Sequence, residues 1–392
     1  MTQTQKSVLT VFLLWFAGLG AATQFAKFSL IFAELSAHYA NSGAGPLLGF
    51  LVSGISLLGI VFGLTAGVLV ARFGVRRLLI AGMILGAVAS LIEGALPPLA
   101  VMLGVRLIEG LSHLVVVVAA PTLISQITQP RYQPLAMSLW STFFGVAYAL
   151  TAWFGTPLVA AFGLSSLFYV HAVWMFAMAA SLWAVLPKDN PAAPVKSLGI
   201  LRQHFDIYTD PARAAPGLAW LCYTLTFVAI LTVIPPFLPD ESRAAVLGIM
   251  PLAGICVSMT LGVVLQRWIA PVNVVVIGFA CAGLATLGFA LSAGNPLFAV
   301  LVFASLGFVQ GANFSAVPAL NPTEEARAHA QGAVAQMGNL GNALGTPVVL
   351  FKIGLFGFGG LIAFALIAYA AGIAVHLGLA HKRAVLARRA AI

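Results

Sequence analysis

The stretch "GVLVARFGVRR", residues 67–77, places three arginines between two segments that are otherwise almost entirely apolar. The chain is apolar back to about residue 46 on one side and forward to about residue 96 on the other. A helix needs roughly 20 apolar residues to cross a hydrocarbon layer about 30 Å thick. The arginines therefore mark a short loop between two membrane-spanning helices.

The composition extends this interpretation to the whole chain of 392 residues, of which 61% are hydrophobic and only 7% are charged. The mean hydropathy is +1.04. These values exclude an ordinary soluble domain and indicate a polytopic membrane protein. The first apolar segment, residues 8–32, is longer than the core of a signal peptide, so we expect it to remain as the first span.

Interruptions by glycine, proline and charged residues predict twelve spans. We expect them at residues 9–34, 46–71, 76–96, 99–127, 134–160, 165–186, 215–238, 243–268, 272–292, 296–318, 328–352 and 357–380. The longest polar interval divides them six and six. The predicted fold is an all-α membrane protein with an N-terminal six-helix bundle at 1–186, a cytoplasmic linker at 187–214 and a C-terminal six-helix bundle at 215–392.

The basic residues predict the orientation, because Lys and Arg accumulate in short cytoplasmic loops. With the N-terminus inside, only Arg243 and Lys352 fall on the outer side. Both termini are therefore expected in the cytoplasm. The net charge of +9 is explained by membrane topology, so no nucleic-acid partner is expected.

Short internal repeats relate the two halves. "GVLVARF" at 67–73 returns as "GVVLQRW" at 262–268, and "EGLSH" at 109–113 returns as "QGANF" at 310–314. "GTP" occurs at 155–157 and again at 345–347. Matches at corresponding places predict two similar bundles, an arrangement typical of secondary transporters.

The opening stretch resembles the loop signature of the major facilitator superfamily. Five positions match it: Gly67, Arg72, Gly74, Arg76 and Arg77. The signature aspartate is replaced by Ala71, and the equivalent position in the second half is Gln266. "RLIEG" at 106–110 is similar to the Arg-x-x-Gln-Gly motif of the family's fourth span, with Glu109 in place of glutamine. "FGTPLVAAFG" at 154–163 matches the family's antiporter motif poorly, which argues against a drug/proton antiporter.

The resemblance implies a monomer with a central cavity between two bundles, opened alternately to either side. The first and fourth helices of each half would line this cavity. The signature residues would form a cytoplasmic gate: Gly67, Arg72, Gly74, Arg76 and Arg77, together with Arg267 in the second half. Without the aspartate, we expect this gate to be weakened, or its acidic partner to come from elsewhere.

Two intramembrane cations are the first candidates for a binding site. Lys27 and Arg106 each lie about seven residues from the outer end of their predicted spans, so they share a depth. Charges inside a membrane usually face a functional cavity. We expect both cations to bind an anionic group of the substrate, with Gln24 one turn from Lys27. The alternative is structural: Arg106 pairs with Glu109, and Lys27 extends toward the interface.

Glu109 and His113 follow Arg106 at helical spacing, so all three can share one face of the fourth span. Burial and neighbouring charges can bring such groups into the physiological range of titration. We therefore expect Glu109 or His113 to carry the coupling proton.

The second half offers polar but uncharged candidates for substrate contacts: Tyr223, Gln310 and Asn313. A cavity with cations on one side and amides on the other suits a small organic anion with hydrogen-bonding groups. The alternative for the amides is hydrogen bonding between helices.

The sequence thus predicts a secondary transporter of a bacterial inner membrane that couples uptake of a small organic anion to protons. Alternatives are an exporter or antiporter, an importer of a neutral vitamin-like solute, or a copper carrier using His171, Met175 and Met178. A transporter-derived sensor or assembly factor is a further alternative. No catalytic motif, resident metal site or cofactor is expected.

Overall fold

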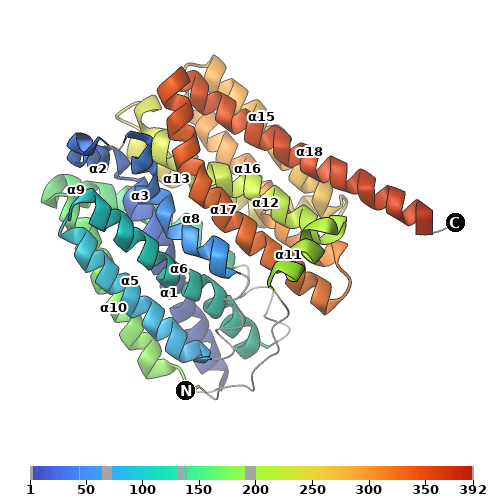
Figure 1. Ribbon diagram of the computed structural model, residues 1–392, viewed down its shortest axis with the longest axis horizontal. Coiled ribbons are helices and arrows are strands. Elements are labelled where there is room, and N and C mark those ends of the chain that lie inside the picture. Colours follow the sequence, from blue (N-terminus) through green and yellow to red (C-terminus); the bar gives the residue numbers. More distant parts are fainter. Residues whose placement is uncertain are drawn as a thin grey trace. The chain divides into compact units, whose positions relative to one another are not determined.

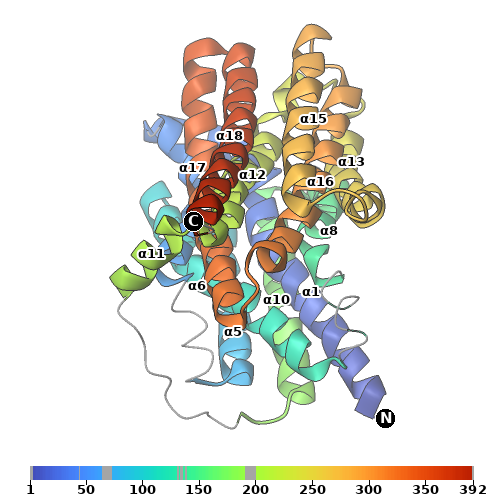
Figure 2. The ribbon, with the colours of Figure 1, turned by 90° about the vertical axis from the view of Figure 1, so that its right-hand side faces the viewer.

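A computed structural model describes residues 3–43, 45–63, 73–129, 132, 136, 139–189 and 200–390, and these residues form helices without β-strands. The internal contacts divide the chain into two compact units, residues 1–196 and 197–392. Figures 1 and 2 show the ribbon from two directions. Within the described residues, ten helices are long and apolar enough to cross a membrane.

The first unit contains α1 (Gln3–Ser29), α2 (Phe32–His38), α3 (Phe50–Ser53), α5 (Val75–Gly94), α6 (Leu99–Ile127), α8 (Phe143–Leu150), α9 (Thr156–Phe162) and α10 (Leu164–Val185). A 3₁₀ turn, Gly54–Ser56, interrupts the second apolar segment directly after α3. A π-helical turn, Thr151–Gly155, joins α8 to α9. Short interruptions of this kind are often found at functional sites.

Four helices of the first unit, α1, α5, α6 and α10, share one apolar core. α5 packs against both α6 and α10, and α1 contacts α6 and α10 (Figure 1). The shared core is apolar along most of its length and includes Leu14, Leu79, Met83, Val116 and Met175. Most of the buried charged residues of these four helices lie toward one end of this core, where α1 and α5 end and α6 and α10 begin.

The second unit contains α11 (Ile200–Thr209), α12 (Pro211–Val233), α13 (Arg243–Val257), α14 (Val263–Leu265), α15 (Pro271–Leu291), α16 (Pro296–Leu320), α17 (Glu324–Phe356) and α18 (Phe358–Ala390). α12 packs along α17, and α15 packs against both α16 and α18. α17 approaches α12 closely at Gly341, which has no Cβ. A Cβ there would stand 2.7 Å from the carbonyl oxygen of Leu221.

The helices confirm the all-α membrane fold, with several differences from the predicted spans. α1 ends at Ser29 instead of residue 34, because a two-residue break separates it from α2. The described part of the second predicted span is a shorter apolar run, Leu47–Gly63. α17 has 33 residues, but it is not among the ten candidates, and polar residues such as Asn339, Asn342 and Lys352 continue along its length. The number of twelve spans therefore stays a prediction.

The predicted linker contains helix α11, whose last turn is fixed to the second unit. The Tyr208 hydroxyl donates to Oε1 of Gln336 on α17 at 2.8 Å, and Nε2 of Gln336 lies 2.6 Å from Nε2 of His204. Burial raises the pKa of Tyr208 to about 12, so this phenol stays a hydrogen-bond donor at physiological pH.

Candidate functional site

Four charged side chains, Lys27, Glu93, Arg106 and Glu109, meet in the first unit and are fully buried. We call them the charge cluster. Nζ of Lys27 lies 2.5 Å from Oε2 of Glu93 and 2.8 Å from Oε1 of Glu109. The Arg106 guanidinium donates through Nη1 to Oε2 of Glu109. The same Nη1 lies 3.7 Å from Oε1 of Glu93. Three helices, α1, α5 and α6, therefore contribute to one ionic network.

Arg106 also binds the backbone of α3, directly before the 3₁₀ turn Gly54–Ser56. Its Nε donates to the carbonyl oxygen of Leu51 at 2.6 Å, and its Nη2 donates to that of Val52 at 3.1 Å. The guanidinium also lies over the Phe28 ring, with Cζ of Arg106 4.1 Å from the ring centroid. Backbone polar groups inside a membrane need internal partners. Arg106 supplies such partners where the regular helix is interrupted.

Ser90 and His171 extend the charge cluster to α10. Lys27 donates to Oγ of Ser90 at 2.5 Å, and this Oγ lies 2.7 Å from Nδ1 of His171. Nε2 of His171 lies 2.9 Å from the carbonyl oxygen of Gly20, which can only accept a hydrogen bond. The neutral imidazole therefore carries its proton on Nε2, and Nδ1 accepts from Ser90. Both ring nitrogens of His171 have partners, so this geometry does not favour the alternative in which His171 binds copper together with Met175 and Met178.

The charge cluster contains two cations and two carboxylates, which balance when all four are ionised. A buried charge without a partner is very costly, whereas a hydrogen-bonded pair is tolerated. Lys27 does not extend toward the interface, as one prediction allowed, because its ammonium group is fully buried among these partners. The predicted pairing of Arg106 with Glu109 is present. Both cations are thus engaged by protein carboxylates in this structure.

Two other predicted residues lie beside the charge cluster. Nε2 of Gln24 donates to Oγ of Ser112 at 2.8 Å, and both side chains are buried. Nδ1 of His113 lies 3.0 Å from the carbonyl oxygen of Ala21 and must donate to it. The His113 ring packs edge-on against Phe25, with centroids 5.0 Å apart. His113 therefore faces α1 through a bond of its own.

The predicted substrate residues of the second half lie in the second unit. Tyr223 is buried and stacks on Trp220, with centroids 4.4 Å apart. Gln310 is half-buried on α16. Asn313 is fully buried, and neither polar atom of its side chain has a hydrogen-bond partner among the described residues. A buried amide without partners costs free energy, so both polar atoms of Asn313 are available to a further hydrogen-bonding group.

In the described part of the predicted gate, the start of α5 is bound by the carboxylate of Asp189, which follows α10 in the chain. Gly74 precedes α5 with φ +91, a conformation that favours glycine. The backbone amides of Arg76 and Arg77 donate to the Asp189 carboxylate, each at 2.9 Å. Asp189 thus supplies negative charge at the start of α5, where the helix dipole favours it. Arg267 is exposed in the turn after α14, while Gly67, Ala71 and Arg72 lie outside the described residues.

Comparison with known proteins decides the family. The profile of the Major Facilitator Superfamily matches residues 14–346. The chain belongs to this superfamily. The fold is similar to the crystal structure of the human organic anion transporter MFSD10 (TETRAN), with a TM-score of 0.71 and 17% sequence identity, covering 96% of this chain and 100% of that one. A search of curated protein sequences gave no significant match. As a member of the superfamily, the protein is a membrane transporter and not an enzyme.

Sequence reasoning missed the roles of three residues in this buried network, Glu93, Ser90 and His171. Glu93 lies one residue before the end of α5, and it was not among the predicted site residues. Depth gave a weaker signal here, because Glu93 lies three residues from the outer end of its predicted span, whereas Lys27 and Arg106 lie about seven residues from theirs. His171 was considered only with Met175 and Met178, which follow it on the same helix face. Its partners come from α1 and α5 and could not be read from local spacing.

Proposed function

We propose that this transporter carries a small organic anion across the membrane together with a proton. The observation that supports the proposal is the fully buried charge cluster, in which two cations are balanced by two carboxylates. The human protein of similar fold is described as an organic anion transporter, which is consistent with this substrate class.

Charge balance connects the anion to the proton. An anion that reaches Lys27 or Arg106 adds one negative charge to a network that is already neutral. Uptake of one proton by a carboxylate restores neutrality, and both charges can then cross a low-dielectric region together. We expect one proton for each negative charge of the substrate, and therefore electroneutral transport.

The substrate contacts follow from the chemistry of the side chains. Arg106 offers a planar fork to a carboxylate or phosphate, and Lys27 offers a point charge. Gln24 lies beside them, while Tyr223, Gln310 and Asn313 supply hydrogen bonds from the second unit. Asn313 is the strongest of these candidates because its buried amide has no partner among the described residues. Sequence reasoning proposes Glu109 and His113 for the proton, and the structure adds Glu93 as a third candidate.

The remaining assignments concern the setting of the transporter. We propose a monomer in a bacterial inner membrane with both termini in the cytoplasm, as the distribution of basic residues indicates. The cytoplasmic gate would include Arg76 and Arg77, with Asp189 as the acid in place of the signature aspartate.

Uptake by proteoliposomes tests the proposal. Purified protein is reconstituted, and a panel of radiolabelled small organic acids is offered with the exterior one pH unit more acidic than the interior. A one-to-one symporter supports up to about tenfold accumulation, because a tenfold ratio corresponds to about 1.4 kcal/mol. An imposed membrane potential should add nothing. Accumulation of a neutral solute alone, or uptake driven by the potential, would contradict the proposal.

A matched pair of variants relates uptake to the charge cluster. Lys27→Gln removes a buried cation, whereas Lys352→Gln removes a half-buried cation of the second unit that contacts Phe356. We expect Lys27→Gln to lose anion uptake and Lys352→Gln to retain it. Equal uptake by both variants would place the substrate elsewhere.

A further inference from the structure

The two carboxylates of the charge cluster are held unequally. Both oxygens of Glu109 accept hydrogen bonds, Oε1 from Lys27 at 2.8 Å and Oε2 from Arg106. Oε2 of Glu93 accepts from Lys27 at 2.5 Å. Oε1 of Glu93 is buried and has no hydrogen-bond partner among the described residues, with Nη1 of Arg106 at 3.7 Å. One oxygen of the network is therefore left without a donor.

We infer that Glu93 takes up and releases the coupling proton on Oε1, and that this step uncovers the positive charge that attracts the substrate. The inference rests on the proposed proton-coupled transport of an anion, and it assigns to Glu93 the role that sequence reasoning gave to Glu109 or His113. It concerns the first unit alone, since every contact that carries it lies between α1, α5, α6 and α10.

The hydrogen-bond inventory favours Glu93 over Glu109. A buried carboxylate is stabilised by donors on both oxygens, and an oxygen without a donor costs free energy. A proton on Oε1 of Glu93 removes the charge from the oxygen that lacks a donor. The bond from Lys27 to Oε2 can remain, although it no longer joins two ions. A proton on Oε2 of Glu109 would replace a charge-assisted bond from Arg106, which is among the stronger hydrogen bonds in proteins. The proton therefore enters at Glu93 with the smaller loss.

The charges explain how this proton would recruit an anion. When Glu93 is neutral, Lys27 and Arg106 face only the Glu109 carboxylate, and the network carries one net positive charge. Lys27 keeps its bonds to Glu109 and Ser90. The excess charge can be compensated by one anionic group of the substrate. Release of the anion restores the charge, and the proton then leaves Glu93 to return the network to four paired ions.

The groups around Glu93 are compatible with this role. Lys27 faces it from α1, Arg106 and Glu109 from α6, and His171 approaches the same Lys27 from α10 at 3.4 Å. Tyr39 follows α2 and donates to the carbonyl oxygen of Pro97 at 2.7 Å. Burial and the Glu93 charge both raise the pKa of Tyr39, so this phenol stays protonated and does not compete for the role.

A pair of neutralising variants tests the inference in proteoliposomes. Glu93→Gln keeps the shape of the side chain and removes its proton exchange. We expect this variant to exchange labelled for unlabelled anion, with an exchange rate that is independent of pH from about 6 to about 8, one unit on either side of neutrality. Accumulation driven by one pH unit should fall from about tenfold to a ratio of about one. Glu109→Gln should weaken uptake through loss of the Arg106 pair, while the remaining uptake still responds to the pH gradient.

The outcomes separate this inference from the proposed function. If the wild-type protein accumulates no organic acid, the proposed function fails. If the wild type accumulates an anion and Glu93→Gln still does so in response to the gradient, only the role of Glu93 fails. The role of Glu93 would also be overturned if Glu109→Gln lost the response of uptake to the pH gradient while Glu93→Gln retained that response.

A second substitution covers the case in which Glu93→Gln does not fold. Glu93→Asp keeps a titrating carboxyl but withdraws it from Lys27. The pH of half-maximal uptake should shift relative to the wild type, whereas Glu109→Asp should leave that pH unchanged and lower only the maximal rate. An unchanged pH profile in Glu93→Asp would overturn the inference.

Discussion

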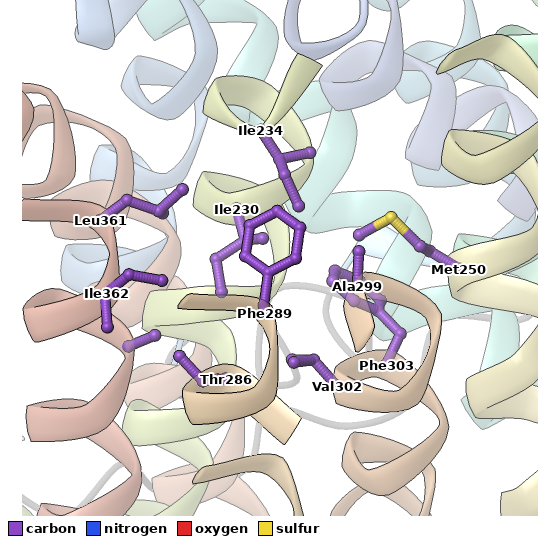
Figure 3. Close-up of a pocket in the computed structure, with 11 residues that line it drawn as sticks. Ile230, Ile234, Met250, Thr286, Phe289, Ala299, Val302, Phe303, Leu361 and Ile362 are labelled. Atoms are coloured by element: carbon purple, nitrogen blue, oxygen red, sulfur yellow. The ribbon is translucent and has the colours of Figure 1, made fainter. Parts of the chain in front are cut away.

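In each unit, helices that correspond in chain order surround a buried region, and the side chains that fill this region differ between the two units. In the first unit α1, α3, α5, α6 and α10 surround the charge cluster. In the second unit α12, α13, α15, α16 and α18 surround a small apolar cavity. Figure 3 shows its lining side chains pointing toward a shared space, among them Ile230, Met250, Phe289, Phe303 and Leu361.

The correspondence extends to individual positions. Ser90 and Glu93 lie three residues apart near the end of α5. Thr286 and Phe289 lie three residues apart near the end of α15 and line the cavity. Ile230, near the end of α12, lines the cavity, whereas Lys27, near the end of α1, enters the charge cluster. The second unit shows that such a bundle packs without ions, so stability alone does not explain the buried charges.

The largest expected effect comes from breaking the charge cluster at one point. Arg106→Met keeps much of the side-chain volume but leaves two carboxylates sharing Lys27, and two backbone carbonyls lose their donors. Removal of one partner from a buried ion pair costs about 3–5 kcal/mol. We expect a large fall in the thermal unfolding midpoint of the detergent-solubilised protein.

A fully apolar network provides the control for that experiment. Replacing all four charged residues with apolar residues of similar volume should recover much of the stability, because neither an unpaired ion nor its desolvation remains. Transport should stay absent. If the apolar variant is as unstable as Arg106→Met, the ions serve packing, and the contrast with the second unit loses its meaning.

The converse experiment introduces a charge into the second unit. Phe289→Glu places a carboxyl beside apolar neighbours where the first unit has Glu93 among cations. Loss of the aromatic side chain alone costs roughly 3 kcal/mol, and the carboxyl adds an unsatisfied polar group. We expect strong destabilisation in the same unfolding assay, compared with less than about 1.5 kcal/mol for Phe289→Met. Equal midpoints would mean that the cavity tolerates ions.

The sequence was sufficient for the fold because that information is local. Apolar runs of helical length, the basic loop at 67–77 and the repeats between halves are each visible in short windows. The superfamily assignment is confirmed over residues 14–346. The interruption at Gly54–Ser56 was missed, because the carbonyls of Leu51 and Val52 directly before it are bound by Arg106, which is distant in sequence. Local patterns do not reveal a partner of that kind.

The site was predicted less completely, for a similar reason. Lys27, Arg106 and Glu109 are visible as charges within apolar runs. Glu93 lies at a helix end, where a carboxylate is unremarkable until its neighbours are known. His171 needs Ser90 and Gly20 from two other helices before its role is visible. Pairing between helices decides this site, and sequence spacing describes only one helix at a time.

Close helix contacts give an intermediate effect that the two units share. A Cβ on Gly110 of α6 would stand 2.2 Å from the carbonyl oxygen of Ile55, and a Cβ on Gly307 of α16 would stand 2.2 Å from that of Gly254. Both are backbone atoms and cannot move aside alone. Overpacking costs about 1–3 kcal/mol, so we expect Gly110→Ala and Gly307→Ala to destabilise the protein similarly.

Gly104 of α6 supplies the matched control for these contacts, because a Cβ there would meet nothing within 4 Å. Gly104→Ala should be neutral or slightly stabilising, since alanine is the better helix former. In transport, Gly110→Ala should have the larger effect of the two tight glycines, as it adjoins the charge cluster and Gly307 does not. Equal loss of uptake in both variants would argue against a special role for the first unit.

The smallest expected effect compares the hydroxyl groups at equivalent positions. Ser90 bridges Lys27 and His171, whereas the Thr286 hydroxyl donates only to the carbonyl oxygen of Ala282 in its own helix at 2.8 Å. Ser90→Ala leaves Nδ1 of His171 without its hydroxyl donor and should cost about 1–2 kcal/mol. Thr286→Val removes a hydroxyl from an apolar cavity and should change stability by no more than about 0.5 kcal/mol. Unfolding midpoints of both variants, measured beside the wild type, check the difference. An equal cost for the two would show that the hydroxyl contributes only to its own helix in each unit, and that Ser90 does not couple α1 to α10.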